Sequence, residues 1–79
     1  MDEFHIKIAE AVKLHRKKAR LSQKSLADYA GIGKTAVYDI EHGKPSIQVN
    51  TLLKVLNVLN IRLQIQTRLT LNEVNDETS

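Results

Sequence analysis

The chain has 79 residues and a formal net charge of +3, which hides a net charge of +6 over residues 13–54 and −3 over residues 69–79. This length allows one small domain with a single core, and dimerisation would bury more surface. With no cysteine and only 3 glycines, the sequence excludes disulfides and thiolate sites, and it argues against a glycine-rich phosphate loop. The basic middle indicates a polyanionic partner, with an ordinary solvated helix face as the alternative.

The first predicted helix runs from about Phe4 to Lys18. Its inward face follows the helical period, at Ile8, Ala11, Val12, His15 and Ala19. Neither proline nor glycine interrupts this segment.

Two short helices are predicted next, over about 23–30 and 34–41. Ser22 is a good N-cap for the first of them, and Gly31 is expected at its C-terminal end in the left-handed region. Gly33 stands at the N-cap of the second helix, where it is a weaker choice than Ser or Asn. Together the two segments have the spacing of a helix-turn-helix.

A fourth helix is predicted from about Val49 to Leu59. Its expected core stripe consists of Val49, Leu52, Leu53, Leu56 and Leu59. Val55 and Val58 widen this stripe beyond the needs of one small core. The stripe over residues 49–59 is expected to form core first, and within it Val55 and Val58 are the two residues that we assign to a dimer seam.

The hydrophobic period changes from helical to alternating after Asn60. Ile61, Leu63 and Ile65 alternate with polar residues, which predicts a strand over residues 61–66. A lone strand leaves backbone groups unpaired, so its partner is expected to be the same strand of a second subunit. The alternative is that these residues extend the fourth helix.

These elements predict a mainly α fold, a bundle of four to five helices with a helix-turn-helix and a C-terminal β-strand paired across a dimer. We expect one DNA-binding and dimerisation domain over residues 1–67. Residues 68–79 are acidic and are expected to form a flexible tail.

Residues 12–59 resemble the Xre/Cro-type helix-turn-helix repressors, which are lambda-repressor-like. The similarity lies in L-S-Q-x-x-L-A-x-x-A-G-I from Leu21 and in V-x-x-I-E-x-G-K from Val37. The segment V-Y-x-x-E-x-G-K-P, the following T-L-L-x-V-L-x-x-L and the alternating strand are similar to HipB-like antitoxins. That resemblance implies an operator-binding dimer that represses its own operon and pairs with a HipA-like kinase toxin.

The third helix of such a fold enters the major groove by its N-terminal residues. Its predicted base contacts are Lys34, Thr35, Tyr38 and Asp39. Lys34 can donate to guanine, Thr35 can bond a base or touch a thymine methyl group, and Asp39 can accept from cytosine.

Phosphate contacts are predicted around the start of the second helix and after the third. They are Ser22, Gln23, Lys24, His42 and Lys44. Gln23 is placed to clamp a phosphate with its side chain and its N–H, helped by the helix dipole. Glu41 would repel phosphate if it were exposed, and the family resemblance implies a buried structural ion pair with Arg16.

No catalytic residue, metal site or cofactor is predicted. Ser22, Ser25 and Thr35 lack a surrounding His–acid arrangement, and no two of the three histidines fall on adjacent turns of one helix face. No apolar run approaches a membrane span, and the acidic N-terminus does not resemble a signal peptide, so a cytoplasmic protein is expected.

The predicted function is therefore a dimeric, sequence-specific repressor that binds a palindromic operator in double-stranded DNA. The predicted dimer contacts are Val55, Val58, Ile61, Leu63 and Ile65. A HipB-like antitoxin is the first reading and a stand-alone Xre-type repressor the second. A protein-interaction module that has lost DNA binding is the alternative from a different class.

Overall fold

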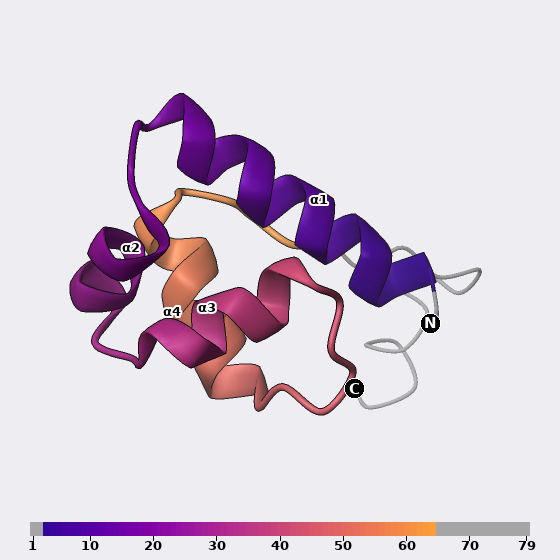
Figure 1. Ribbon diagram of the computed structural model, residues 1–79. Coiled ribbons are helices and arrows are strands. Elements are labelled where there is room, and N and C mark those ends of the chain that lie inside the picture. The colour runs from indigo at the N-terminus through magenta and orange to yellow at the C-terminus, as the bar shows by residue number, and fades with distance from the viewer. Residues whose placement is uncertain (1–2, 65–79) are drawn as a thin grey trace, which may run out of the picture.

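The computed structural model describes residues 3–64, and this part of the chain folds into four helices. They are α1 (Glu3–Lys18), α2 (Gln23–Ala30), α3 (Lys34–Glu41) and α4 (Val49–Val58). Helix α3 packs against each of the other three, and α2 also packs against α4 (Figure 1). The limits predicted for α2 and α3 are confirmed, and α1 begins one residue earlier than predicted.

The core takes one fully buried residue from each helix. Val12, Leu26, Val37 and Val55 are each 0% exposed. Other buried apolar side chains, among them Ile40 and Leu56, and partly exposed ones surround them, so the four helices share a single core. Burying these side chains is the main term that stabilises so short a chain.

The buried face of α1 differs in part from the predicted face. Ile8 and Val12 are buried as expected, together with Ala9. His15 and Ala19 are exposed, because the C-terminal turn of α1 extends past the elements that cover its beginning. The ring nitrogen Nδ1 of His15 instead lies 2.8 Å from the carbonyl oxygen of Ala11, its own helix neighbour.

The stripe predicted for α4 is wrong at two positions. Val49 is 70% exposed and Leu53 is 50% exposed, whereas Val55 and Leu56 are buried. Val55 has no surface left for a partner subunit, so its assignment to the dimer seam is corrected to the core. Apolar residues cover more than one face of this helix, so only packing against α2 and α3 selects the buried one.

Helix α4 ends before the segment that was predicted as a strand. Asn60 has a φ of 59°, and the N–H of Ile61 donates to the carbonyl oxygen of Leu56 over 2.8 Å. Such a left-handed residue closes a helix, which excludes the extension of α4. Residues 61–64 form neither helix nor strand in this single chain and turn back toward α1 (Figure 1).

Parts of two predictions lie outside the described residues. These are Ile65 and Gln66 of the predicted strand, and the acidic segment 68–79. Within residues 3–64, no helix combines the length and apolar character that crossing a membrane requires.

Candidate nucleic-acid interface

The turn between α2 and α3 has the geometry that its sequence predicted. Gly31 has a φ of 72°, a conformation that side chains with a Cβ atom adopt at a cost. Its N–H donates to Ala27 and Asp28, and the N–H of Ile32 also donates to the carbonyl oxygen of Ala27, over 3.0 Å. Ile32, next to this turn, packs against the core with part of its surface still exposed.

The start of α2 is held by the side chains of its N-cap residue and of its first residue. Ser22 Oγ accepts the N–H of Ser25 over 3.0 Å, which caps the helix. Gln23 Nε2 donates to Glu41 Oε1 over 3.3 Å, and this bond connects the beginning of α2 to the end of α3. The side chain predicted to clamp a phosphate therefore already has a partner inside the protein.

Arg16 and Glu41 form an ion pair that joins α1 to α3. Arg16 Nε lies 2.5 Å from Glu41 Oε2 and Nη2 lies 3.1 Å from Oε1, so the contact is bidentate. Arg16 Nη1 also donates to the carbonyl oxygen of Leu21 over 2.8 Å, just before α2. The Glu41 side chain is only 2% exposed, which withdraws its charge from solvent.

The charge of Glu41 is maintained by its neighbours. Burial by itself would raise the pKa of this carboxyl group, but hydrogen bonds from Arg16 and Gln23 and the charges of Arg16 and Lys13 outweigh it. Its pKa therefore lies below the ordinary value for glutamate. The hydrogen bond to Glu41 likewise raises the pKa of Arg16. Both groups are ionised in the folded protein over the neutral range.

The first turn of α3 is open to solvent. Gly33 caps the helix without a side-chain hydrogen bond, and Lys34 and Thr35 are both exposed. With Gln23 and Tyr38 they line a surface depression of about 460 Å³. Four of the predicted DNA contacts, from both helices of the motif, thus meet at one concave surface.

Other predicted DNA contacts are paired with one another or with their own helix. Asp39 Oδ2 lies 3.5 Å from Lys44 Nζ, and Lys24 Nζ lies 2.9 Å from Asp28 Oδ2. Both lysines remain exposed. Asp39 does not line the depression at the start of α3.

Besides the two lysine pairs, two further contacts of this surface were missed by the sequence reasoning. One is the bond from Gln23 to Glu41, for which the sequence holds no local signal because 18 residues separate the partners. The other is a stack between the rings of Tyr38 and His42. Their spacing of four residues on one helix is a signal that could have predicted this pair.

A profile of the helix-turn-helix family (HTH_3) matches residues 12–66, which include every element of this surface. The chain belongs to the helix-turn-helix family. It is 38% identical over 58 residues to the uncharacterized HTH-type transcriptional regulator y4mF of Sinorhizobium fredii (strain NBRC 101917 / NGR234). That alignment covers 73% of this chain and 76% of the relative.

Solved structures share the same helix-turn-helix fold. A chain of the HipA-HipB-O2-O3 complex superposes with a TM-score of 0.72 at 23% identity, covering 82% of this chain and 92% of that one. The structure named MDT Protein matches with the same TM-score, identity and coverage. At this level of identity the likeness establishes the arrangement of the helices.

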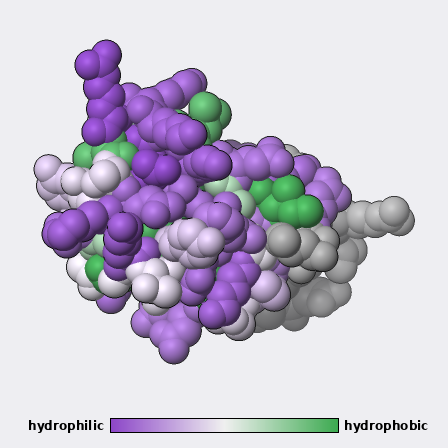
Figure 2. Space-filling model, viewed as in Figure 1, coloured by the Kyte–Doolittle hydropathy of each residue, from purple (hydrophilic) through white to green (hydrophobic). Residues whose placement is uncertain are grey.

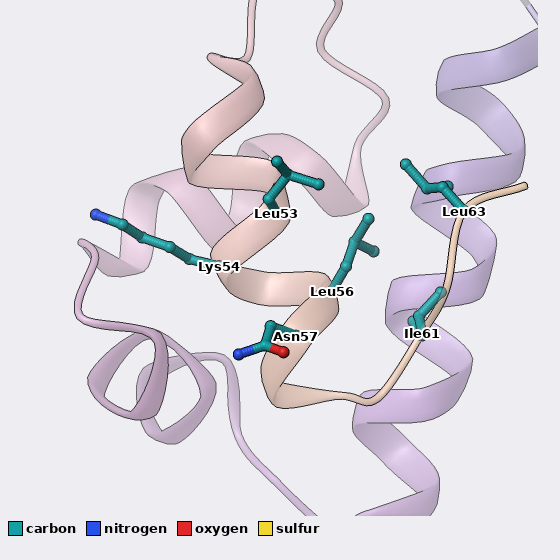
Figure 3. Close-up of a pocket in the computed structure, with 6 residues that line it drawn as sticks. All are labelled: Leu53, Lys54, Leu56, Asn57, Ile61 and Leu63. Carbon is teal, nitrogen blue, oxygen red and sulfur yellow. The ribbon is translucent and has the colours of Figure 1, made fainter. Parts of the chain in front are cut away.

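The surface of this helix-turn-helix chain is not uniform. The face seen in Figure 2 is mainly hydrophilic, with separate apolar patches. An open groove of about 510 Å³ lies between α4 and the segment that follows it, lined by Leu53, Lys54, Leu56, Asn57, Ile61 and Leu63. Figure 3 shows the four apolar side chains of this groove on α4 and on the segment after it, with Lys54 extending away from them.

Proposed function

We propose that the protein is a sequence-specific, DNA-binding transcriptional repressor that acts as a homodimer. The observation that carries this proposal is the open depression formed by Gln23, Lys34, Thr35 and Tyr38 where α2 and α3 begin. Unbonded N–H groups at helix N-termini attract phosphate, and side chains at the start of a recognition helix reach base edges. Membership of the helix-turn-helix family supports the same function.

Base reading is assigned to the exposed first turns of α3. Lys34 would donate to guanine O6 or N7, and Thr35 would bond a base or contact a thymine methyl group. Tyr38 would reach a base from the next turn. Asp39 would accept from cytosine N4, since a carboxylate can accept several hydrogen bonds, while Lys44 Nζ lies 3.5 Å from its Oδ2.

Phosphate binding is assigned to the side chains around this surface. Ser22, Gln23 and Lys24 surround the start of α2, and Lys44 follows α3. These contacts would position the protein on the duplex without selecting a sequence. The hydrogen bond from Gln23 to Glu41 fixes the Gln23 side chain, which supports a fixed geometry of the proposed phosphate contact.

The proposed dimer forms through α4 and the segment after it. Val58, Ile61, Leu63 and Ile65 remain the assigned contacts, and the exposed Leu53 joins them in place of the buried Val55. The alternating segment 61–66 would pair with its copy as an intermolecular two-stranded ribbon. A twofold dimer would then read two half-sites separated by about 34 Å, one turn of DNA, or by a multiple of it.

Within this class, the preferred role is that of a HipB-like antitoxin that also binds a HipA-like kinase toxin in the cytoplasm. It is supported by the motif V-Y-x-x-E-x-G-K-P, by the leucine-rich segment after it and by the fold shared with a chain of the HipA-HipB-O2-O3 complex. The acidic segment 68–79 is one candidate surface for that partner. A stand-alone Xre-type repressor is the second role.

The first experiment tests DNA reading. The protein selects its preferred duplex from a random-sequence library, and the Lys34→Ala/Thr35→Ala variant is then compared with the parent on that duplex and on scrambled DNA. We expect the preference to fall by about 1–3 kcal/mol for each lost contact. Lys54→Ala on α4 is the control and should keep it. If the double variant keeps the full preference for the selected duplex over scrambled DNA, the assignment of base reading to the start of α3 is refuted.

Salt dependence separates this function from a protein-interaction module. Binding that displaces counterions from phosphates weakens steeply as the salt concentration rises. The logarithm of the binding constant falls with the logarithm of the salt concentration, with a slope of about −0.9 for each phosphate neutralised. Absence of duplex selection and of salt dependence together would favour the interaction module.

A second experiment tests the dimer surface. Leu63→Glu is expected to shift the protein from dimer to monomer in light scattering, because it places a charge in an apolar contact. Leu14→Glu alters a similarly exposed leucine on α1 and should leave the dimer intact. A monomeric parent protein, or an unchanged dimer in Leu63→Glu, would overturn this interface.

A further inference from the structure

The rings of Tyr38 and His42 form a tight stack on the exposed side of α3. Their centroids lie 3.8 Å apart and their planes differ by 22°. Positions four residues apart lie on successive turns of one helix face, which allows this contact. His42 therefore covers one face of the Tyr38 ring, while Tyr38 as a whole stays 50% exposed.

Two hydrogen bonds hold His42 to the residue on which it stacks. Its main-chain N–H donates to the carbonyl oxygen of Tyr38 over 3.0 Å, and its ring nitrogen Nδ1 lies 2.7 Å from the same oxygen. A carbonyl oxygen can only accept, so Nδ1 carries the hydrogen. The backbone of α3 thus fixes the orientation of the imidazole ring before any DNA is bound.

This bond limits what the other ring nitrogen can do. A neutral imidazole has one nitrogen that donates and one that accepts, so Nε2 of His42 is an acceptor. Phosphate oxygens at neutral pH also accept. A neutral His42 therefore has no ring hydrogen to offer to phosphate, which argues against the direct contact suggested by its sequence position.

We propose that His42 is a positioning residue that holds the Tyr38 ring at the base-reading surface and so helps to set the sequence preference. This inference rests on the proposed DNA-binding function. Tyr38 lines the same depression as Lys34 and Thr35, so its orientation determines what that surface presents. A ring that is already fixed loses less conformational freedom on binding than one that must be ordered.

The test compares two replacements of His42 on the duplex selected by the parent protein and on its single-base-pair variants, at mildly alkaline pH. His42→Ala removes the stack, whereas His42→Phe keeps an aromatic face and removes both ring nitrogens. Tyr38→Ala identifies the base pair concerned, where we expect discrimination to fall by about 5- to 100-fold. At that base pair His42→Ala should lower the discrimination by about 2- to 10-fold, and His42→Phe, which keeps the stack without the Nδ1 bond, should restore part of it.

Salt titration distinguishes positioning from phosphate binding. The salt dependence of His42→Ala should equal that of the parent protein. The proposal is overturned if His42→Ala weakens all duplexes equally and reduces the salt slope by about 1, or if it changes no discrimination at any base pair. Failure of His42→Phe to restore discrimination would also overturn it.

Two controls keep this result separate from other failures. Circular dichroism checks the fold of each variant, and His42→Gln, which lacks a ring, repeats the comparison if His42→Ala does not fold. If the parent protein selects no duplex at all, the proposed function fails and the positioning role fails with it. If the parent selects a duplex and His42→Ala behaves like a lost phosphate contact, only the positioning role fails.

Discussion

The two helices of the helix-turn-helix begin in different ways. The start of α2 is tied down, because Ser22 caps it by accepting from Ser25 and Gln23 donates to Glu41. The start of α3 is open, because Gly33 supplies no side-chain cap. The N-terminus of α2 is therefore held by two side chains, whereas the N-terminus of α3 has no side-chain cap.

This difference fits two separate tasks in the proposed complex. A helix that sets the position of the protein on the DNA backbone needs a fixed geometry. A helix that reads bases needs side chains and N–H groups free of internal partners, as Lys34 and Thr35 are placed in the exposed first turn of α3. Anchoring α2 through Glu41, at the far end of α3, leaves that turn available.

Removing the anchor should have the largest effect. Glu41→Ala leaves Arg16 without its partner at a contact where both side chains are largely withdrawn from solvent. We expect the free energy of unfolding, measured by urea titration, to fall by about 3–5 kcal/mol. Lys24→Ala, which breaks the exposed pair with Asp28, is the matched control and should change it by less than about 0.5 kcal/mol. Equal stability of Glu41→Ala and the parent would show that this anchor is unimportant.

Acid should weaken the same anchor. The pKa of Glu41 is lower in the folded chain than its ordinary value, so its contribution is fully present above the unfolded pKa. That contribution is lost as pH falls through the lower, folded pKa. The stability difference between the parent and Glu41→Gln, followed by urea unfolding, should therefore shrink as pH falls from about 6 to about 3. A constant difference across this range would contradict the shift.

The cap of α2 should contribute less than the ion pair. Ser22→Ala removes the oxygen that accepts from Ser25, and we expect a loss of about 1 kcal/mol in the free energy of unfolding. Ser46→Ala, in an exposed turn, tests for a general effect of losing a hydroxyl group and should be close to neutral. Similar losses of stability in Ser22→Ala and Ser46→Ala would show that the hydroxyl of Ser22 has no specific role as a cap.

Closing the open start of α3 should have the smallest effect. Gly33 has a φ of −77° and a ψ of 152°, and a Cβ atom built there meets nothing within 4 Å. Gly33→Ser can therefore supply a cap, and it should stabilise the fold by a few tenths of a kcal/mol, about the measured gap between Gly and Ser caps. Gly31→Ser is the contrasting control, since its φ of 72° should make the same change destabilising. A loss of stability in Gly33→Ser would contradict the open cap.

Much of the motif could be predicted from residues that act locally. The N-cap Ser22, the left-handed Gly31 and the apolar period around Leu26 and Val37 determine where α2 and α3 begin and end. Each of these signals operates through hydrogen bonds or side chains a few residues apart, so the sequence contains them directly. The pairing of Arg16 with Glu41 was expected only from the family resemblance.

The face of α4 could not be predicted in the same way. Val49 and Leu53 are as apolar as Val55, yet they are exposed and Val55 is buried. When a helix is apolar on more than one side, the periodicity of its sequence is compatible with burial of any of those sides. Val49 and Leu53 can therefore be recognised as surface residues only after the buried face of α4 is known.

The sequence by itself determined the helix-turn-helix, its turn geometry and the residues at the start of α3, because capping and periodicity are short-range effects. Only the tertiary structure decided that Gln23 bonds to Glu41 and that Val55, rather than Val49 or Leu53, belongs to the core. The first contact joins two helices whose bonded residues are 18 positions apart, and the second outcome depends on which face of α4 is covered. Such choices are made by packing the whole chain around one core, not by any local segment.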